Sequence, residues 1–116
     1  MSYTSTCHCG TIGATIAGDL PAEAMTCNCS ICRRKGTVLH FVPADAASLH
    51  APAGKLGDYR FGKNAIHHHF CMDCGCTPFA TGTDPQGNAM VAVNLRCVED
   101  CDLDRLKLTA VDGASF

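Results

Sequence analysis

Cysteine is the residue that most constrains this chain, because 10 of its 116 residues are Cys. A small chain so rich in Cys is held together either by disulfides or by metal ions. Its first residues contain neither the basic segment nor the apolar run of a secretory signal, so we expect a reducing, cytoplasmic environment. In that environment, closely spaced Cys residues are more often metal ligands than disulfide partners.

The rest of the composition narrows the class of protein. Hydrophobic residues make up 47% of the chain and charged residues 17%, which is too apolar for disorder and too interrupted by charge for a membrane span. A net charge of -2 and the absence of Trp disfavour binding of nucleic acid. The length is typical of one domain, so we expect a single domain over residues 1–116 that binds neither nucleic acid nor membrane. The oligomeric state is not predicted.

The pattern of apolar residues predicts an all-β fold with little helix. Alternating or β-branched segments predict strands over residues 11–17, 38–42, 55–61, 65–70, 89–95 and 105–110. In the first of these, Ile12, Ala14 and Ile16 share one face. The third and fourth flank a Gly62-Lys63-Asn64 turn and are expected to pair as a hairpin. Residues 44–50 are expected to form a short helix.

A small β domain of this kind has a thin core and needs a further stabilising element. A structural zinc ion contributes about 10 to 16 kcal/mol in small peptides, against a net stability of about 5 to 15 kcal/mol for a whole domain. One ion could therefore decide whether the chain folds.

Two Cys pairs have the character of a closed zinc site. Cys71-x-x-Cys74 followed by Gly75 is typical of a zinc knuckle, in which a tight turn presents two thiolates to one ion. A tetrahedral site requires two more ligands, and the Cys7-x-Cys9 pair is the nearest equivalent by type. We therefore assign Cys7, Cys9, Cys71 and Cys74 to one structural ion.

A third group, Cys27-x-Cys29-x-x-Cys32, presents three thiols from a single short segment. Catalytic zinc sites typically have three protein ligands and leave the fourth position to water or substrate. The alternative is a second closed site, whose fourth ligand would be one of Cys76, His8, Cys97 and Cys101.

The order of these motifs resembles the glutathione-dependent formaldehyde-activating enzyme family, which shares its domain with centromere protein V. The motifs are C-x-C-G at 7–10, C-x-C-S-x-C-R-R at 27–34, H-H-F-C-x-x-C-G at 68–75, N-L-R-C at 94–97 and D-x-D-x-L at 102–106. They span nearly the whole chain. The resemblance implies a small, zinc-stapled Mss4-like β-tent with two zinc ions, one structural and one treated as catalytic, the latter at Cys27, Cys29 and Cys32.

The resemblance also implies an activity. The family joins glutathione to formaldehyde as S-hydroxymethylglutathione, which makes it a carbon-sulfur lyase, so we expect an enzyme acting on a thiol-aldehyde adduct with a small thiol such as glutathione as partner. The chain departs from the family in being shorter than the enzyme that names it. Cys76, Cys97 and Cys101 also include thiols outside the ligand pattern. The alternative function is a non-catalytic zinc-binding module that binds a protein partner.

Basic residues directly follow the third Cys group. A zinc ion with three thiolates carries a formal charge of -1, and a substrate thiolate would make it -2, so nearby cations are needed. Arg33 and Arg34 are candidate substrate-binding residues, because guanidinium groups bind carboxylates in a bidentate manner. The alternative is a solvated basic loop.

The His67-His68-His69 run is not assigned to a metal. Alternation along a strand places His67 and His69 on one face and His68 on the other, so the three rings cannot converge on one ion. We expect surface groups or groups that hold ligand sulfurs. No residue is singled out as the acid or base, and the catalytic residues stay unknown.

Overall fold

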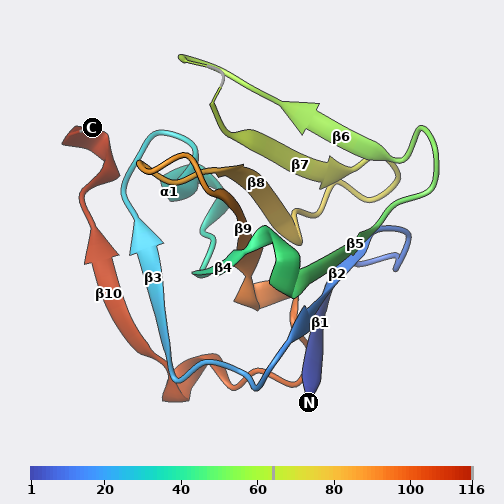
Figure 1. The fold of residues 1–116 in the computed structure, drawn as a ribbon, viewed down its shortest axis with the longest axis horizontal. Helices are drawn as coiled ribbons and strands as arrows, with labels where there is room; N and C mark the ends of the chain where they lie inside the picture. The colour runs from blue at the N-terminus through green and yellow to red at the C-terminus, as the bar shows by residue number, and fades with distance from the viewer. Residues whose placement is uncertain (64, 116) are drawn as a thin grey trace.

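The computed structural model describes residues 1–63 and 65–115, and these residues fold mainly as β-strands in two sheets (Figure 1). The smaller sheet has the order β1 (Ser2–Thr6), β2 (Gly13–Ala17) and β5 (Ala47–His50). The larger sheet has the order β10 (Lys107–Val111), β3 (Glu23–Cys27), β4 (Leu39–Pro43), β9 (Ala89–Asn94), β8 (Phe79–Thr83), β7 (His67–Cys71) and β6 (Leu56–Tyr59). The predicted all-β fold, a small β-tent, is confirmed.

Helical structure is limited to short segments. The α-helix α1 (Cys32–Lys35) follows the third Cys group, and the 3-10 turns are η1 (Ala44–Ala46), η2 (Leu95–Cys97), η3 (Leu103–Arg105) and η4 (Gly113–Ser115). The described part of the chain holds no helix long and apolar enough to cross a membrane.

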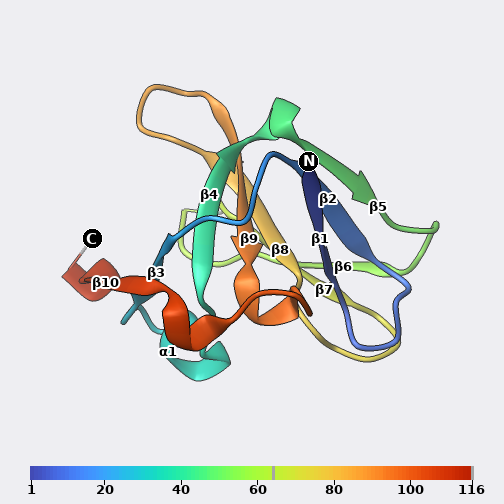
Figure 2. The same cartoon turned by 90° about the horizontal axis from the view of Figure 1, so that it is seen from below.

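The strand pairings are antiparallel with one exception. β10 runs parallel to β3, with Val111 opposite Cys27. A parallel pair needs a crossover connection, and here nearly the whole large sheet separates the two strands in sequence. Figure 2 shows the two strands at one side of the molecule, with α1 next to them. The last segment of the chain is thereby placed beside the Cys27 loop.

The core lies between the two sheets. Ala14 and Ile16 on β2 are 0% and 1% exposed and pack with Phe79 and Val93 of the large sheet. Ile12, just before β2, is 0% exposed and packs instead with Cys7 and Cys71. The predicted common face of Ile12, Ala14 and Ile16 is confirmed, and through Ile12 it packs against the thiols of Cys7 and Cys71.

The six predicted strands are present as β2, β4, β6, β7, β9 and β10, with ends shifted by a few residues. The predicted hairpin is also present, because β6 and β7 pair antiparallel with Leu56 opposite Cys71. Its predicted turn includes Asn64, which lies outside the described residues.

The predicted helix at 44–50 is wrong. Only Ala44–Ala46 form a 3-10 turn, and the following residues form β5, in which Ala47 pairs with Ile16 and His50 with Gly13. A helix of two turns is marginal in water. Pairing with the buried strand β2 instead gives the backbone N–H and C=O groups of this segment hydrogen-bond partners. Glycine is required at position 13, because a Cβ there would lie 2.8 Å from the His50 ring and 2.7 Å from the Ser5 carbonyl oxygen.

Candidate metal centres

Four thiols from distant parts of the chain form the first cluster. Cys7, Cys9, Cys71 and Cys74 have sulfur atoms that all lie within 4.8 Å of one another. The Cys9 sulfur is 3.7 Å from that of Cys7 and 3.6 Å from that of Cys71. These distances are too long for a disulfide, and they are close to the sulfur-sulfur separation of about 3.8 Å that a tetrahedron with zinc-sulfur bonds of about 2.3 Å requires.

Two tight turns bring these sulfurs together, and in the first of them the N–H of Gly10 donates to the Cys7 carbonyl oxygen at 3.1 Å. The N–H of Gly75 donates to the Cys71 carbonyl oxygen at 2.9 Å, and Gly75 has the positive φ of 79° that the knuckle turn requires. Backbone N–H groups also point at the sulfurs: that of Ile12 lies 3.4 Å from the Cys7 sulfur and that of Asp73 lies 3.4 Å from the Cys71 sulfur. Such N–H groups stabilise thiolates bound to a metal.

Two thiols of the first cluster, Cys74 and Cys71, differ in their pKa values. Backbone N–H groups of Cys76 and Cys9 lower the pKa of Cys74 to about 6. The N–H of Cys74 favours the Cys71 thiolate, but burial and the neighbouring Cys9 and Cys7 thiols outweigh it and raise the pKa of Cys71 to about 11. Cys74 therefore forms a thiolate readily whereas Cys71 resists, and a bound divalent cation would favour the Cys71 thiolate. The residues fit a closed zinc site.

The second cluster is local. Cys27 ends β3, Cys29 lies in the following turn and Cys32 begins α1, and their sulfurs all lie within 4.8 Å of one another. The N–H of Cys29 points at the Cys27 sulfur at 3.5 Å, and that of Cys32 points at the Cys29 sulfur at 3.4 Å. All three residues are half-buried, so the cluster lies nearer the surface than Cys7 and Cys71 do.

The second cluster also fits a cation. Burial, together with the thiols of Cys29 and Cys27, raises the pKa of Cys32 to about 12. Three soft sulfur donors suit zinc, and within 1–63 and 65–115 the group contains no fourth Cys, His, Asp or Glu. A bound ion would therefore have one coordination position that these residues do not fill.

The other thiols lie elsewhere. Cys76 packs against the buried Cys7, Ile12 and Cys71. Burial raises the pKa of Cys97 to about 11, and its thiol donates to the Thr77 carbonyl oxygen at 3.4 Å. Cys101 packs against the main core, where burial raises its pKa.

The three basic residues after Cys32 line two different surface depressions. Arg34 and Lys35 line a cavity of about 420 Å³ that extends to Tyr59 on β6 and to Gly75 and Thr77 just after the zinc knuckle. Arg34 Nη1 donates to the Ser30 carbonyl oxygen at 2.7 Å, and Lys35 Nζ donates to Thr77 Oγ1 at 3.1 Å. The lining also includes Asp58 and Ile31, the residue before Cys32, but no Cys of either cluster. Burial lowers the pKa of Lys35.

Arg33 faces a different depression, which it shares with Cys27, Asn28 and Asp112. The two Arg residues predicted to bind substrate are therefore not side by side at one surface. Lys35 belongs to the same basic run, and only the fold shows that its ammonium group reaches Thr77, just after the knuckle.

The three His side chains do not converge, as predicted. His67 and His69 are stacked with ring centroids 5.8 Å apart, while His68 stacks on Phe61 at 5.4 Å. His67 Nδ1 lies 3.0 Å from Asp58, and the His69 ring nitrogens lie near the Gly57 carbonyl oxygen and Thr81 Oγ1. These contacts hold the β6–β7 hairpin and the adjoining β8 together rather than holding ligand sulfurs.

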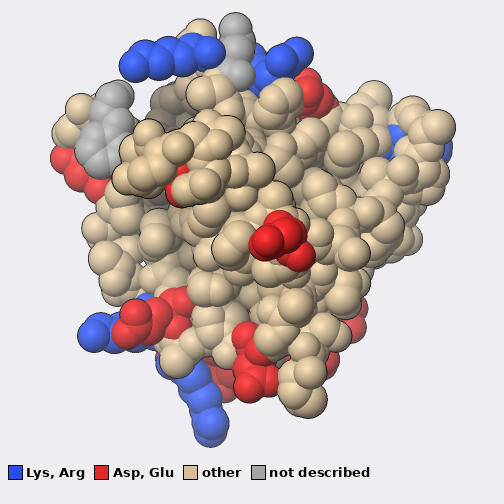
Figure 3. Space-filling model, viewed as in Figure 1, with Lys and Arg blue, Asp and Glu red and all other residues tan. Residues whose placement is uncertain are grey.

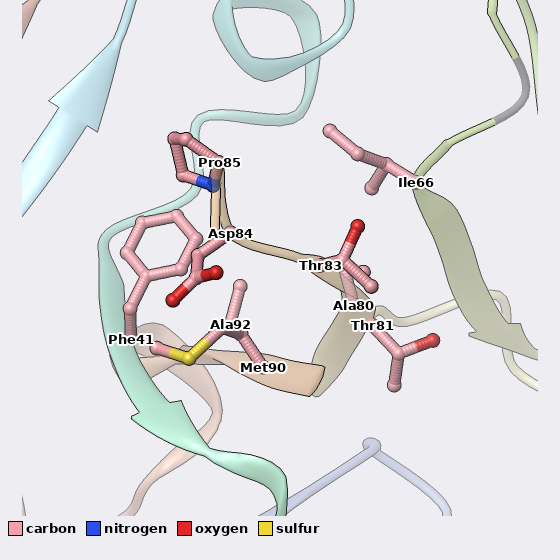
Figure 4. A pocket seen from close by; sticks show the side chains of 10 residues that line it. Phe41, Ile66, Ala80, Thr81, Thr83, Asp84, Pro85, Met90 and Ala92 are labelled. Carbon is pink, nitrogen blue, oxygen red and sulfur yellow. The ribbon is translucent and has the colours of Figure 1, made fainter. Parts of the chain in front are cut away.

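Two further surface features are separate from the clusters. An apolar cavity of about 310 Å³ lies on the large sheet, and no Cys belongs to its lining. Figure 4 shows Phe41, Ile66, Met90 and Pro85 among the side chains around it. Figure 3 shows a face that is mostly uncharged, with Lys, Arg, Asp and Glu side chains mainly toward its rim and no extended basic patch among its described residues.

Comparison with known proteins agrees with this arrangement. A solved Rhodobacter sphaeroides protein has a similar structure, with a TM-score of 0.75 and 25% sequence identity over 91% of this chain and 99% of that chain. A sequence model of the glutathione-dependent formaldehyde-activating enzyme matches residues 2–110, which include both cysteine clusters. The chain therefore belongs to the glutathione-dependent formaldehyde-activating enzyme family.

Proposed function

We propose that this protein makes and breaks the carbon-sulfur bond of a thiol-aldehyde adduct at a zinc ion held by Cys27, Cys29 and Cys32. Cys7, Cys9, Cys71 and Cys74 hold a second, structural zinc ion. The observation that carries the proposal is a group of three thiols, without a fourth protein ligand among the described residues, followed by Arg34 and Lys35, which line a cavity together with Ile31 and Asp58. Family membership supports glutathione as the thiol and formaldehyde as the aldehyde.

The chemistry needs a thiolate at neutral pH. A free thiol with a pKa of about 8.5 is mostly protonated there, and a bound zinc ion supplies the positive charge that keeps it deprotonated. In the forward direction, the thiol sulfur forms a bond to the aldehyde carbon, the C=O double bond becomes a C–O single bond, and the thiol proton ends on that oxygen. The reverse reaction breaks the carbon-sulfur bond and returns thiol and aldehyde.

The basic side chains serve binding and charge balance. A thiol such as glutathione carries carboxylates, and the cavity lined by Arg34 and Lys35 presents two cations to them. Arg34 Nη1 and Lys35 Nζ each donate a hydrogen bond to protein, to the Ser30 carbonyl oxygen and to Thr77 Oγ1. The cavity volume of about 420 Å³ lies in the range of about 300 to 1,000 Å³ usual for small-molecule sites. Arg33, on the other side of Cys27, offsets the charge of the thiolates.

The test combines metal release with adduct formation. A mild chelator should remove one of two zinc ions quickly, and glutathione should slow that release while the other ion stays bound. Exchange spectroscopy by NMR should show faster interconversion of glutathione plus formaldehyde with the S-hydroxymethyl adduct. Equal retention of both ions, insensitive to glutathione and without faster exchange, would instead support a non-catalytic zinc module that binds a protein partner.

A further inference from the structure

The turn that follows β10 lies directly on the second cluster. We call residues Asp112–Ser115 the strap. Because β10 runs parallel to β3 with Val111 opposite Cys27, the strap begins beside the point where the ligand loop begins (Figure 1). The N–H of Asn28 donates to the Val111 carbonyl oxygen at 3.2 Å and extends this pairing into the loop. The family match ends at residue 110, so the strap lies beyond it.

Asn28 fastens the strap to the ligand loop from between two of the ligands. Its Nδ2 donates to Asp112 Oδ1 at 2.9 Å, and its Oδ1 accepts from the N–H of Ala114 at 3.0 Å. Ser115 Oγ donates to the other oxygen of Asp112 at 2.6 Å, so that carboxylate is held on both sides. Because the Asn28 amide donates through Nδ2 and accepts through Oδ1, its side chain has one orientation. These two hydrogen bonds fix the backbone between Cys27 and Cys29.

Gly113 brings the strap into contact with the sulfur itself. A Cβ at this position would overlap Cys27 Sγ and would lie 3.3 Å from the Cys29 Cβ. Gly113 is not among the glycines with a positive φ, so its φ does not itself require glycine. The requirement for glycine therefore comes from the approach to Cys27 and not from the turn.

We propose that the strap is one wall of the second metal centre, in which Asn28, Asp112 and Gly113 are positioning residues that hold the thiols of Cys27 and Cys29 around the ion and slow its loss. Three ligands from one half-buried loop hold an ion less firmly than a complete set of four, and groups outside the ligand shell commonly change metal affinity by about 10- to 100-fold. This inference rests on the second zinc ion of the proposed function.

The first experiment adds one methyl group at the strap. In protein loaded with zinc, release to a chromogenic chelator is followed for Gly113→Ala and for a control, Gly82→Ala on β8. The control methyl meets its nearest neighbour at an ordinary 3.4 Å, also at a residue without a positive φ. We expect about 10-fold or faster loss of one ion in Gly113→Ala, unchanged loss of the other, and unchanged loss of both in the control.

A second pair of variants tests the hydrogen bonds. Asn28→Asp places a carboxylate against that of Asp112 and should also speed the loss of that ion. Asn28→Asp/Asp112→Asn restores a donor facing an acceptor and should slow the loss again. With cobalt in place of zinc, the thiolate charge-transfer bands of the second site should shift in the single variant and return in the double variant. This rescue is a signature that general destabilisation does not produce.

The outcomes distinguish a failure of the proposed function from a failure of the inference about the strap. If wild-type protein holds only one ion, the proposed function fails. If it holds two ions, but Gly113→Ala and Asn28→Asp release them at the wild-type rate, or the double variant shows no rescue, the inference about the strap fails alone. If Gly113→Ala does not fold, as judged by circular dichroism and loss of the first ion, the Asn28 variants decide.

Discussion

Replacing one Cys of each cluster by Ser should destabilise the protein unequally, with the larger loss at the first cluster. Cys9 and Cys29 form a matched pair, because each is the second Cys of a C-x-C motif and neither is buried. Cys→Ser removes a zinc ligand at each position without emptying core volume. The difference between the two variants therefore reports what each ion does for the fold.

The magnitude follows from which segments each ion joins. In the first cluster, Cys9 and Cys71 are 62 residues apart, whereas Cys27 and Cys32 belong to one short loop. If the substitution releases the ion, the loop-entropy relation for covalent cross-links makes the long connection worth about 4 kcal/mol and the short one about 2 kcal/mol. At about 4 °C per kcal/mol, Tm should fall by about 16 °C in Cys9→Ser and about 8 °C in Cys29→Ser.

Calorimetry of zinc-loaded protein, with zinc counted in each sample, measures this difference. Cys101→Ser is the control, because that thiol is half-buried like Cys29 but belongs to neither cluster, and it should lose no zinc. Equal losses of Tm in the two ligand variants, or a larger loss in Cys29→Ser, would refute the division into a structural and an exchangeable ion.

Three further outcomes are expected. Phe79→Ala empties a fully buried site in the main core and should lower the free energy of unfolding by about 3 to 5 kcal/mol in a denaturant titration; a loss below about 1 kcal/mol would contradict the packing. In zinc-free protein, Cys74 should be alkylated much faster than Cys71 at pH 7, because the pKa of Cys74 is about 6 and that of Cys71 about 11. The rate at Cys74 should fall as pH drops through about 6, and peptide mapping that finds equal rates at both thiols would contradict these shifts. Arg34→Gln should raise KM for glutathione about 10-fold with little change in kcat, and steady-state kinetics showing the reverse would remove Arg34 from substrate binding.

The features that could be predicted from the sequence are those that depend on residues close together in the chain. The alternation of Ile12, Ala14 and Ile16 identified a buried strand face, because period two has one structural meaning when every second residue is apolar. The grouping of the Cys residues was also predictable in outline, since C-x-x-C-G forms a knuckle by itself and needs a second pair. Ligation of metal by these thiols stays a prediction.

Long-range pairing could not be predicted in the same way. The segment after Pro43 has a helical composition, but the exposed edge of β2 was available to it, and pairing there produced β5. Nothing in the local sequence of Asn28 shows that it bonds to Asp112, which lies 84 residues away and arrives only because β10 pairs with β3. The division of Arg33 and Arg34 between two surfaces likewise depends on where α1 sits.

X-ray absorption at the zinc edge, together with zinc counted per chain under reducing conditions without chelator, tests the central claim most directly. We predict two zinc ions, one bound by four sulfurs and the other by three sulfurs and a lighter atom that glutathione replaces with a fourth sulfur. A single ion per chain, four protein sulfurs around both ions, or the same thiols joined as disulfides would contradict the account.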